Sequence, residues 1–435
     1  MISDSIITIV RGTIGLVSLV LICYLLSNNR KKIQWKTVLI SILIQFIVVV
    51  LIIKVPLFQS FFSVISKFFI RIINYTTSGS TFLFSSLIDQ EKSSYIFAFQ
   101  VLPIIIFFSA LTSVLYHLGI IQKIVSFLAW FLNRFLNITG AESLSLAGNI
   151  FLGQTESPIL IKSYLEKMTK PQLFLVMVGG MSTVAGSVLA AYVGLLGGDD
   201  LNEQLKFSTH LLTASVMAAP GAVAISKIIF PDTEKNAERS VEIERGEING
   251  NILLSITRGT VEGLKLAVNV GAMLLVFLAF ISLLNDLMWL IGELFNLNDI
   301  ISESTNFDKL SIEFVLGYLF APILWLIGVT YQECALMGQL LGIKIVSSEF
   351  VAFIQLADFN TIDASVNLLS KKSITMATFM LCGFANFASI GIQIGGIGVL
   401  APNQRKNLSE LGFKAMVAGT IVSLVSACFA GILIS

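Results

Sequence analysis

The stretch TGAESLSLAGNIFLGQTESP, from Thr139 to Pro158, holds two carboxylates, Glu142 and Glu156, between strongly apolar neighbours. It is too short and too polar to cross a bilayer as a helix, which takes about 20 apolar residues. Non-helical backbone at membrane depth is tolerated only where protein or a watery cavity satisfies its N–H and C=O groups. We therefore expect a re-entrant hairpin with Glu156 at its tip.

A second version of this pattern occurs later in the chain. Thr330-Tyr-Gln-Glu333 is followed by Gly338 and then by Glu349, as the first stretch runs from Thr139 to Glu156. Each stretch leads through a lysine-bearing turn (LEKMTKPQL, LLSKKSITM) into a span interrupted by small and polar residues (GGMSTVAGS, CGFANFASIG). A unit of three crossings plus a hairpin makes its copy start from the opposite side of the membrane. The sequence therefore predicts an inverted repeat, an architecture common among secondary transporters.

The composition places the whole chain in a membrane. Of 435 residues, 55% are apolar and only 13% are charged, which a water-exposed surface does not tolerate. Apolar runs long enough to span recur along the chain. We expect eight spans, at Ile6–Leu26, Thr37–Val55, Ile96–Leu118, Leu173–Leu196, Thr209–Phe230, Leu264–Leu284, Ile374–Gly398 and Lys414–Ile434.

The predicted fold is an all-α integral membrane protein with about eight transmembrane helices, two re-entrant hairpins in an inverted repeat, and interfacial helices. Leu57–Ile73 and Ile124–Leu136 mix apolar residues with Lys, Arg and Asn, a pattern typical of helices that lie along the interface. The expected organisation is scaffold and interfacial helices (1–138), a first transport repeat (139–230), a charged connection with a scaffold span and an interfacial helix (231–329), and a second transport repeat (330–435). The connection begins with the long charged run at 231–250.

Several functional classes are disfavoured by what the chain lacks. Lys plus Arg (28) nearly balance Asp plus Glu (27), so no basic field indicates a nucleic acid polymer as partner. The four cysteines show no CxxC spacing, and with only two histidines a zinc or histidine-based catalytic site is poorly supported. A membrane enzyme would need a nucleophile with a base or a metal cluster. We expect no enzymatic activity.

The two hairpins and the two interrupted spans carry the polar groups of a binding site. A carboxylate within a membrane costs at least about 2.5 kcal/mol, so Glu156 and Glu349 in matching places indicate a substrate or ion site. Amides, hydroxyls and an aromatic ring accompany them: Asn149, Gln154, Thr155, Phe384, Asn386 and Ser389. Such groups suit a neutral solute with hydroxyls and a heteroaromatic ring, whereas an anion would call for arginine, which neither hairpin tip nor interrupted span contains.

Alternatives to this interpretation remain open from the residues alone. Buried glutamates can also be structural, and Glu142 and Glu333, which precede the tips, fit that role as well as a site. A passive channel is a further alternative, although it does not need two carboxylates beside amides. A transporter of another small polar solute, such as an amino acid or a dicarboxylate, is the strongest rival, and the missing arginines disfavour it.

Neutral oxygens near the first hairpin suggest an ion site. Asn149, Thr183 and Ser187 supply side-chain oxygens near carbonyls that the hairpin and the glycine-rich interruption release. Hard oxygen ligands of low charge suit a monovalent cation such as sodium. Thr and Ser can instead bond back to their own helix.

At these residues the chain resembles the concentrative nucleoside transporter family. The resemblance is carried by GAESLSLAGNIFLGQTESP (140–158), GGMSTVAGSVLAAYVG (179–194), EFVAF (349–353) after Gly342 and Lys344, and CGFANFASIGIQIGGIGVLAP (382–402). It covers roughly Gly140 to the C-terminus. It implies a bacterial ion-coupled nucleoside symporter in the cell inner membrane, a multi-pass and usually homotrimeric protein whose transport domain moves against a scaffold in an elevator-type cycle.

The resemblance also implies roles for single residues. In the family the Gln154-Thr155-Glu156 tip faces the nucleobase of a substrate such as uridine, cytidine or adenosine, and Val188 lines the same pocket. Glu349, Asn386 and Ser389 hold the ribose, with Phe384 beside them. Sodium maps onto Asn149, Thr183 and the carbonyls near Leu152 and Ser187. Some members use protons instead, and the retained oxygens favour sodium here.

One position departs from the family pattern. The family usually has Asn before EFVA, and here the residue is Ser348. Its shorter side chain puts the ribose contacts and the substrate selectivity in doubt at this position.

Overall fold

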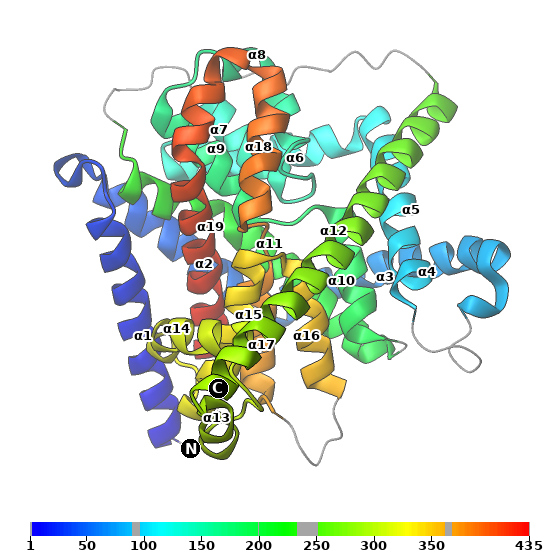
Figure 1. The fold of residues 1–435 in the computed structure, drawn as a ribbon. Coiled ribbons are helices and arrows are strands. Elements are labelled where there is room, and N and C mark those ends of the chain that lie inside the picture. The colour runs from blue at the N-terminus through cyan, green and yellow to red at the C-terminus, as the bar shows by residue number, and fades with distance from the viewer. Residues whose placement is uncertain (1, 89–95, 199, 233–250, 362–367, 435) are drawn as a thin grey trace.

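The computed structural model describes residues 2–88, 96–198, 200–232, 251–361 and 368–434, and throughout these ranges the regular structure is helical (Figure 1). Of the predicted charged connection at 231–250, only Pro231 and Asp232 belong to the described residues. The structure confirms the all-α membrane fold, because eight helices in the described ranges are long and apolar enough to span a bilayer.

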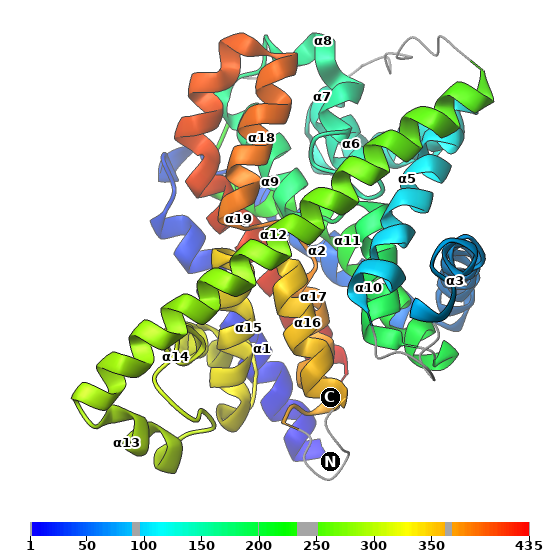
Figure 2. The same cartoon turned by 45° about the vertical axis from the view of Figure 1, so that its right-hand side comes forward.

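The N-terminal third forms six helices. They are α1 (Ile2–Leu25), α2 (Trp35–Lys54), α3 (Pro56–Phe84), α4 (Phe97–Gln100), α5 (Leu102–His117) and α6 (Ile120–Leu136). The predicted interfacial segment Leu57–Ile73 is part of α3, which by length and composition could also span. Figure 2 shows α3 nearly end-on while α1 stands upright, so the two helices lie crosswise. The interfacial placement of α3 and α6 stays a prediction.

The first repeat begins with α7 (Gly140–Asn149), which a capping box of Thr139 and Glu142 starts. Its return limb is not a second long helix but a 3₁₀ segment, Ser157–Ile161, and one turn of α8 (Lys162–Leu165). Pro158 in this limb supplies no backbone N–H, which suits a short helical start. The repeat continues through α9 (Lys170–Ser182), α10 (Gly186–Gly197) and α11 (Leu201–Ile229).

The second repeat has the same order of elements. After α12 (Ile252–Leu294), α13 (Leu297–Ser304) and α14 (Ile312–Leu326), it consists of α15 (Cys334–Val346), α16 (Glu349–Thr361), α17 (Lys371–Leu381), α18 (Phe387–Leu400) and α19 (Arg405–Leu433). The predicted span Ile374–Gly398 is therefore two short helices, α17 and α18, and it is not among the eight long apolar helices.

The two repeats are inverted relative to each other. In Figures 1 and 2, α9 lies above α10, whereas α17 lies below α18. The chain therefore passes through its two broken helices in opposite directions, as the duplicated sequence pattern predicts. The break in each is a short extended segment, at 183–185 and at 382–386.

The central helices are buried, whereas α12 is largely exposed on the outside of the molecule. The most apolar window of the α9–α10 span is completely buried, whereas only 11% of the corresponding window of α12 is buried. Long α12 crosses the molecule obliquely and packs on α5 (Figure 2). Gly259 makes this packing close, because a Cβ there would lie 2.6 Å from the Ser113 Cβ. An exposed apolar helix of this length is stable in lipid and not in water.

Candidate functional site

The two broken helices meet at their breaks. The Phe384 N–H donates to the Thr183 carbonyl at 3.2 Å, which joins one break to the other. Gly383 has φ +146°, and a Cβ there would lie 3.0 Å from the Ser182 carbonyl oxygen, so the close approach requires glycine. Each break leaves backbone groups without helical partners, which gives the protein a polar centre among apolar helices.

A buried carboxylate lies on the side of the second repeat. Glu349 begins α16 and is 4% exposed. Its Oε1 accepts from the Tyr192 hydroxyl of α10 at 2.9 Å, and its Oε2 accepts from Asn386 Nδ2 at 2.8 Å. Asn386 also caps α18, because its Oδ1 accepts from the Ser389 N–H at 2.8 Å. These donors are what a buried carboxylate requires.

The tip of the first hairpin reaches the same place. Gln154 Nε2 donates to Ser389 Oγ at 3.1 Å, while Gln154 Oε1 is buried without a partner. Thr155 packs against α18, since a Cβ at Gly396 would lie 2.6 Å from Thr155 Cγ2. Gln154, Ser389, Asn386 and Glu349 therefore form one continuous polar chain that the sequence only predicted to be close.

Glu156 lies apart from that chain. Its Oε2 accepts from the Gly153 N–H at 3.2 Å, and its side chain is open to a cavity of about 290 Å³. This volume is near the lower end of small-molecule pockets, about 300 Å³. The cavity walls come from α5, the start of α10 and α12, and they include Arg258 and Glu262. Arginine is thus absent from the tips and breaks but present on the facing wall.

Val188 and Phe384 complete the predicted substrate residues. Val188 is buried in α10, and Phe384 is partly buried at the second break. Ser348 uses its Oγ as an acceptor for the Val351 N–H at 3.5 Å, at the start of α16. A larger cavity of about 840 Å³ lies between α14 and the start of α15, and no predicted site residue lines it.

The predicted sodium residues gather at the first break. Asn149 ends α7 and is 1% exposed, and neither its Oδ1 nor its Nδ2 has a hydrogen-bond partner. It lies against the last turn of α9, because a Cβ at Gly179 would be 3.3 Å from Asn149 Nδ2. Thr183 Oγ1 donates to the Gly179 carbonyl at 2.9 Å, so its lone pairs stay available.

The hairpin tip is tied to the start of α10 beside this point. The Gly186 N–H donates to the Phe151 carbonyl at 3.0 Å, and Leu152 and Ser187 are buried next to them. An unpaired buried amide oxygen costs about 1–3 kcal/mol, and a cation ligated by Asn149 Oδ1 would remove that cost. In the described part of the chain no three His, Cys, Asp or Glu residues gather as metal ligands, so a divalent site has no carboxylate cluster there.

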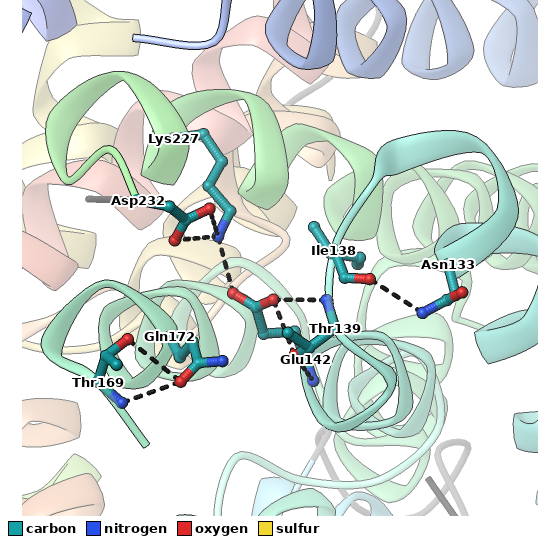
Figure 3. Close-up of polar contacts among 8 residues, drawn as sticks. All are labelled: Asn133, Ile138, Thr139, Glu142, Thr169, Gln172, Lys227 and Asp232. Atoms are coloured by element: carbon teal, nitrogen blue, oxygen red, sulfur yellow. Dashed lines mark hydrogen bonds and ion pairs between the residues drawn. The ribbon is translucent and has the colours of Figure 1, made fainter. Parts of the chain in front are cut away.

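Glu142 and Glu333 belong to the hairpin bases. Glu142 accepts from Lys227 Nζ at 2.8 Å and from the Thr139 N–H at 2.7 Å, and Lys227 also contacts Asp232 (Figure 3). Glu333 accepts from the Ser370 and Ser373 hydroxyls at the start of α17. Of the two roles that the sequence left open for these glutamates, the contacts favour the structural one.

Two site residues were missed by sequence reasoning. Tyr192 lies within the quoted motif 179–194 and its hydroxyl is the sole polar side-chain group in LAAYVG, which is the signal that could have found it. Lys344 was quoted only as part of a motif, yet it is completely buried and its Nζ donates to the Met380 carbonyl at 2.8 Å.

Comparisons with known proteins agree with this geometry. Three family models match along the chain: Na⁺-dependent nucleoside transporter N-terminus over 14–87, nucleoside recognition over 98–199, and Na⁺-dependent nucleoside transporter C-terminus over 210–431. The first match extends the similarity into the N-terminal helices, where sequence motifs were uninformative.

Individual relatives are similar over nearly the whole chain. An uncharacterized transporter of Haemophilus influenzae is 40% identical over 98% of both chains. Sodium/nucleoside cotransporter 2 of Rattus norvegicus is 36% identical over 96% of this chain, which spans 62% of that relative. The structure of CNTnw in an inward-facing substrate-bound state superimposes with a TM-score of 0.88 at 36% identity, covering 98% of each chain.

Proposed function

Because this chain belongs to the family of Na⁺-dependent nucleoside transporters, we propose that it imports nucleosides by symport with sodium through an elevator-type cycle. Membership makes the protein a transporter and not an enzyme, and it makes sodium the coupling ion, so the expectation of sodium over protons is confirmed. Uridine, cytidine and adenosine are the proposed substrates.

The observation that carries the proposal is the polar chain between the two hairpins. Glu349 and Asn386 offer a carboxylate and an amide to the ribose, because diol protons can be donated to a carboxylate that has lone pairs to spare. Gln154 Oε1 has no partner and can accept from a nucleobase amide or amine. Ser389 links the two ends through Gln154, so a nucleoside spans groups that are already held in place.

The rest of the pocket follows from neighbouring positions. Thr155, Val188 and Phe384 form its apolar and hydroxyl-bearing wall, and Glu156 faces the adjoining cavity through which the solute arrives or leaves. Sodium is held by Asn149 and Thr183 with the carbonyls near Leu152 and Ser187. Binding there fixes the first hairpin against α9 and thereby orders the tip that carries Gln154.

The elevator movement is proposed from the contrast in burial. The two hairpins and broken helices form the transport domain, within 139–230 and 330–435, and α5 and exposed α12 belong to the scaffold. The apolar surface of α12 is available to lipid and to two further copies, in a homotrimer in the bacterial inner membrane. The hairpins are re-entrant in this proposal.

Uptake by proteoliposomes tests the function. Purified protein is reconstituted, and labelled uridine and adenosine are supplied with an inward sodium gradient, with equal sodium on both sides, or with choline in place of sodium. We expect accumulation only with the gradient. Uptake that is equal in sodium and choline contradicts sodium symport, and uptake of a small amino acid in place of uridine contradicts the nucleoside pocket.

A further inference from the structure

The second break holds a charge that the proposed transport site does not use. Lys344 lies two residues before the end of α15, and it is 0% exposed. Its ammonium donates to the Met380 carbonyl, which belongs to the last turn of α17 just before the break. A buried ammonium is costly unless its environment is built for a cation. The carbonyls at the end of a helix provide such an environment, because they carry the negative end of the helix dipole.

The first break has the same construction without the ammonium. Asn149 is the last residue of α7, and Lys344 lies near the end of α15. Asn149 lies against the last turn of α9, and Lys344 lies against the last turn of α17; each of these is the first half of a broken helix. Among the described residues no lysine or arginine donates to a carbonyl of the last turn of α9. Asn149 instead brings an amide whose two polar atoms have no partner.

A carboxylate lies near each of the two breaks. Glu156 shares a cavity with the first residues of α10, and Glu349 is bonded to Asn386 at the start of α18. A carboxylate therefore lies near the N-terminal end of each second half-helix, where the dipole favours it. The cation at the C-terminal end of the first half-helix is the element that differs between the repeats.

We propose that the Lys344 ammonium takes, at the second break, the place that sodium takes at the first, as a cation tethered to the protein. The inference rests on the proposed sodium site at Asn149 and Thr183. It makes Lys344 a positioning residue: the ammonium neutralises the end of α17 and attracts the Glu349 carboxylate, which holds that carboxylate ready for the ribose. It also limits each chain to one bound sodium ion.

Two substitutions separate charge from shape. Lys344→Met removes the ammonium and keeps most of the length of the side chain. Lys344→Asn opens space and supplies the amide oxygen that Asn149 supplies at the first break. Sodium binding is measured without nucleoside, as the rise in unfolding temperature on sodium titration of purified protein, since an ion that binds only the folded state stabilises it. Equilibrium binding of radioactive sodium gives the number of ions.

The wild-type protein should bind about one sodium ion per chain, with a Hill coefficient of about one. Lys344→Asn should gain a second ion and a steeper titration, and Lys344→Met should not. With saturating sodium, Lys344→Met should also bind uridine at least about tenfold more weakly, because Glu349 loses the cation that positions it. Lys227→Met is the matched control: it removes a buried ammonium at the base of the first hairpin and should change stability but not the sodium count.

The inference is overturned if wild-type protein binds two sodium ions, a result that does not depend on any variant folding. It is also overturned if Lys344→Asn and Lys344→Met give the same sodium titration. Absence of uridine binding by wild-type protein would contradict the proposed function instead, while the sodium counts would still decide the role of Lys344.

Discussion

The first and second hairpins approach their broken helices in the same way but bring different groups. Asn149 of the first hairpin ends with a buried, unpaired amide at the last turn of α9. Lys344 of the second hairpin ends with an ammonium bonded to the last turn of α17. At the second break the cation belongs to the chain, whereas at the first break a buried amide oxygen is left without a partner, which the proposed sodium ion would satisfy. On this proposal, duplication followed by one such difference makes a symmetric fold depend on sodium on one side only.

The largest expected effect comes from the negative charges of the two carboxylates, Glu156 and Glu349. Nucleoside monophosphates should compete with labelled uridine at least roughly 100-fold less well than uridine does, because a phosphate beside Glu156 and Glu349 is opposed by about 3 kcal/mol. Arg258 lines the same cavity as Glu156 and Glu262, so its single positive charge is outnumbered there. Competition by uridine monophosphate that equals competition by uridine would remove the two carboxylates from the substrate path.

Glu349→Gln tests the carboxylate of the second hairpin. The change keeps the shape and removes the charged acceptor, and hydrogen bonds to charged groups contribute about 1.5–3 kcal/mol, which is roughly 10- to 100-fold in affinity. Uridine affinity measured by calorimetry at saturating sodium should fall by that factor, while sodium binding without nucleoside should stay nearly unchanged. Glu333→Gln, at the base of the same hairpin, is the control and should leave uridine affinity unchanged. Wild-type affinity in a folded Glu349→Gln protein would place the ribose elsewhere.

Thr183→Val tests the first break. It should weaken sodium binding and leave uridine binding nearly unchanged, the reverse of Glu349→Gln. It removes a hydroxyl at nearly constant volume, and the sodium concentration for half-maximal uptake should rise roughly tenfold, because about 1–1.5 kcal/mol of ligation is lost. Uridine affinity at saturating sodium should change much less. Thr378→Val is a close control, since Thr378 of α17 is buried and bonds to the carbonyl four residues earlier, as Thr183 does. Equal shifts in both variants would show that no ion is specific to the first break.

Ser389→Ala tests the contact between the tip of the first hairpin and α18, and it should have the smallest effect. It removes the neutral hydrogen bond to Gln154, which contributes about 0.5–1.5 kcal/mol, so uridine affinity should fall by a few-fold. The factor by which sodium raises uridine affinity should shrink as well, because Ser389 links the first tip to Asn386. Ser226→Ala, at a buried serine of α11, is the control. A loss of affinity with full sodium coupling would mean that coupling does not pass through this contact.

The inverted repeat and both breaks could be predicted from the sequence because local chemistry produces them. Gly383 and Asn386 interrupt one span with a residue that tolerates positive φ and a residue that caps the next helix. Local patterns of this kind are visible without tertiary structure. The sequence also assigned Glu349 and Asn386 to one site, and in the structure Asn386 Nδ2 donates to Glu349 Oε2.

The remaining features depend on contacts between distant segments. Tyr192 meets Glu349 across 157 positions, and nothing in the helix that holds Tyr192 indicates its partner. The environment of Lys344 arises only where α15 meets the carbonyl that the break in α17 exposes. Glu156 lies outside the polar chain because the turn after Gly153 directs its side chain into the cavity, a geometry that sequence spacing does not encode.

The most direct test of the account is the reciprocity of sodium and uridine binding to the wild-type protein. Uridine affinity is measured by calorimetry over a series of sodium concentrations, and sodium affinity over a series of uridine concentrations. If sodium at Asn149 and Thr183 orders the tip that holds the nucleobase, each ligand raises the affinity of the other by the same factor, and Thr183→Val reduces that factor in both directions. Uridine affinity that is independent of sodium, with uptake that follows a pH gradient, would contradict the account.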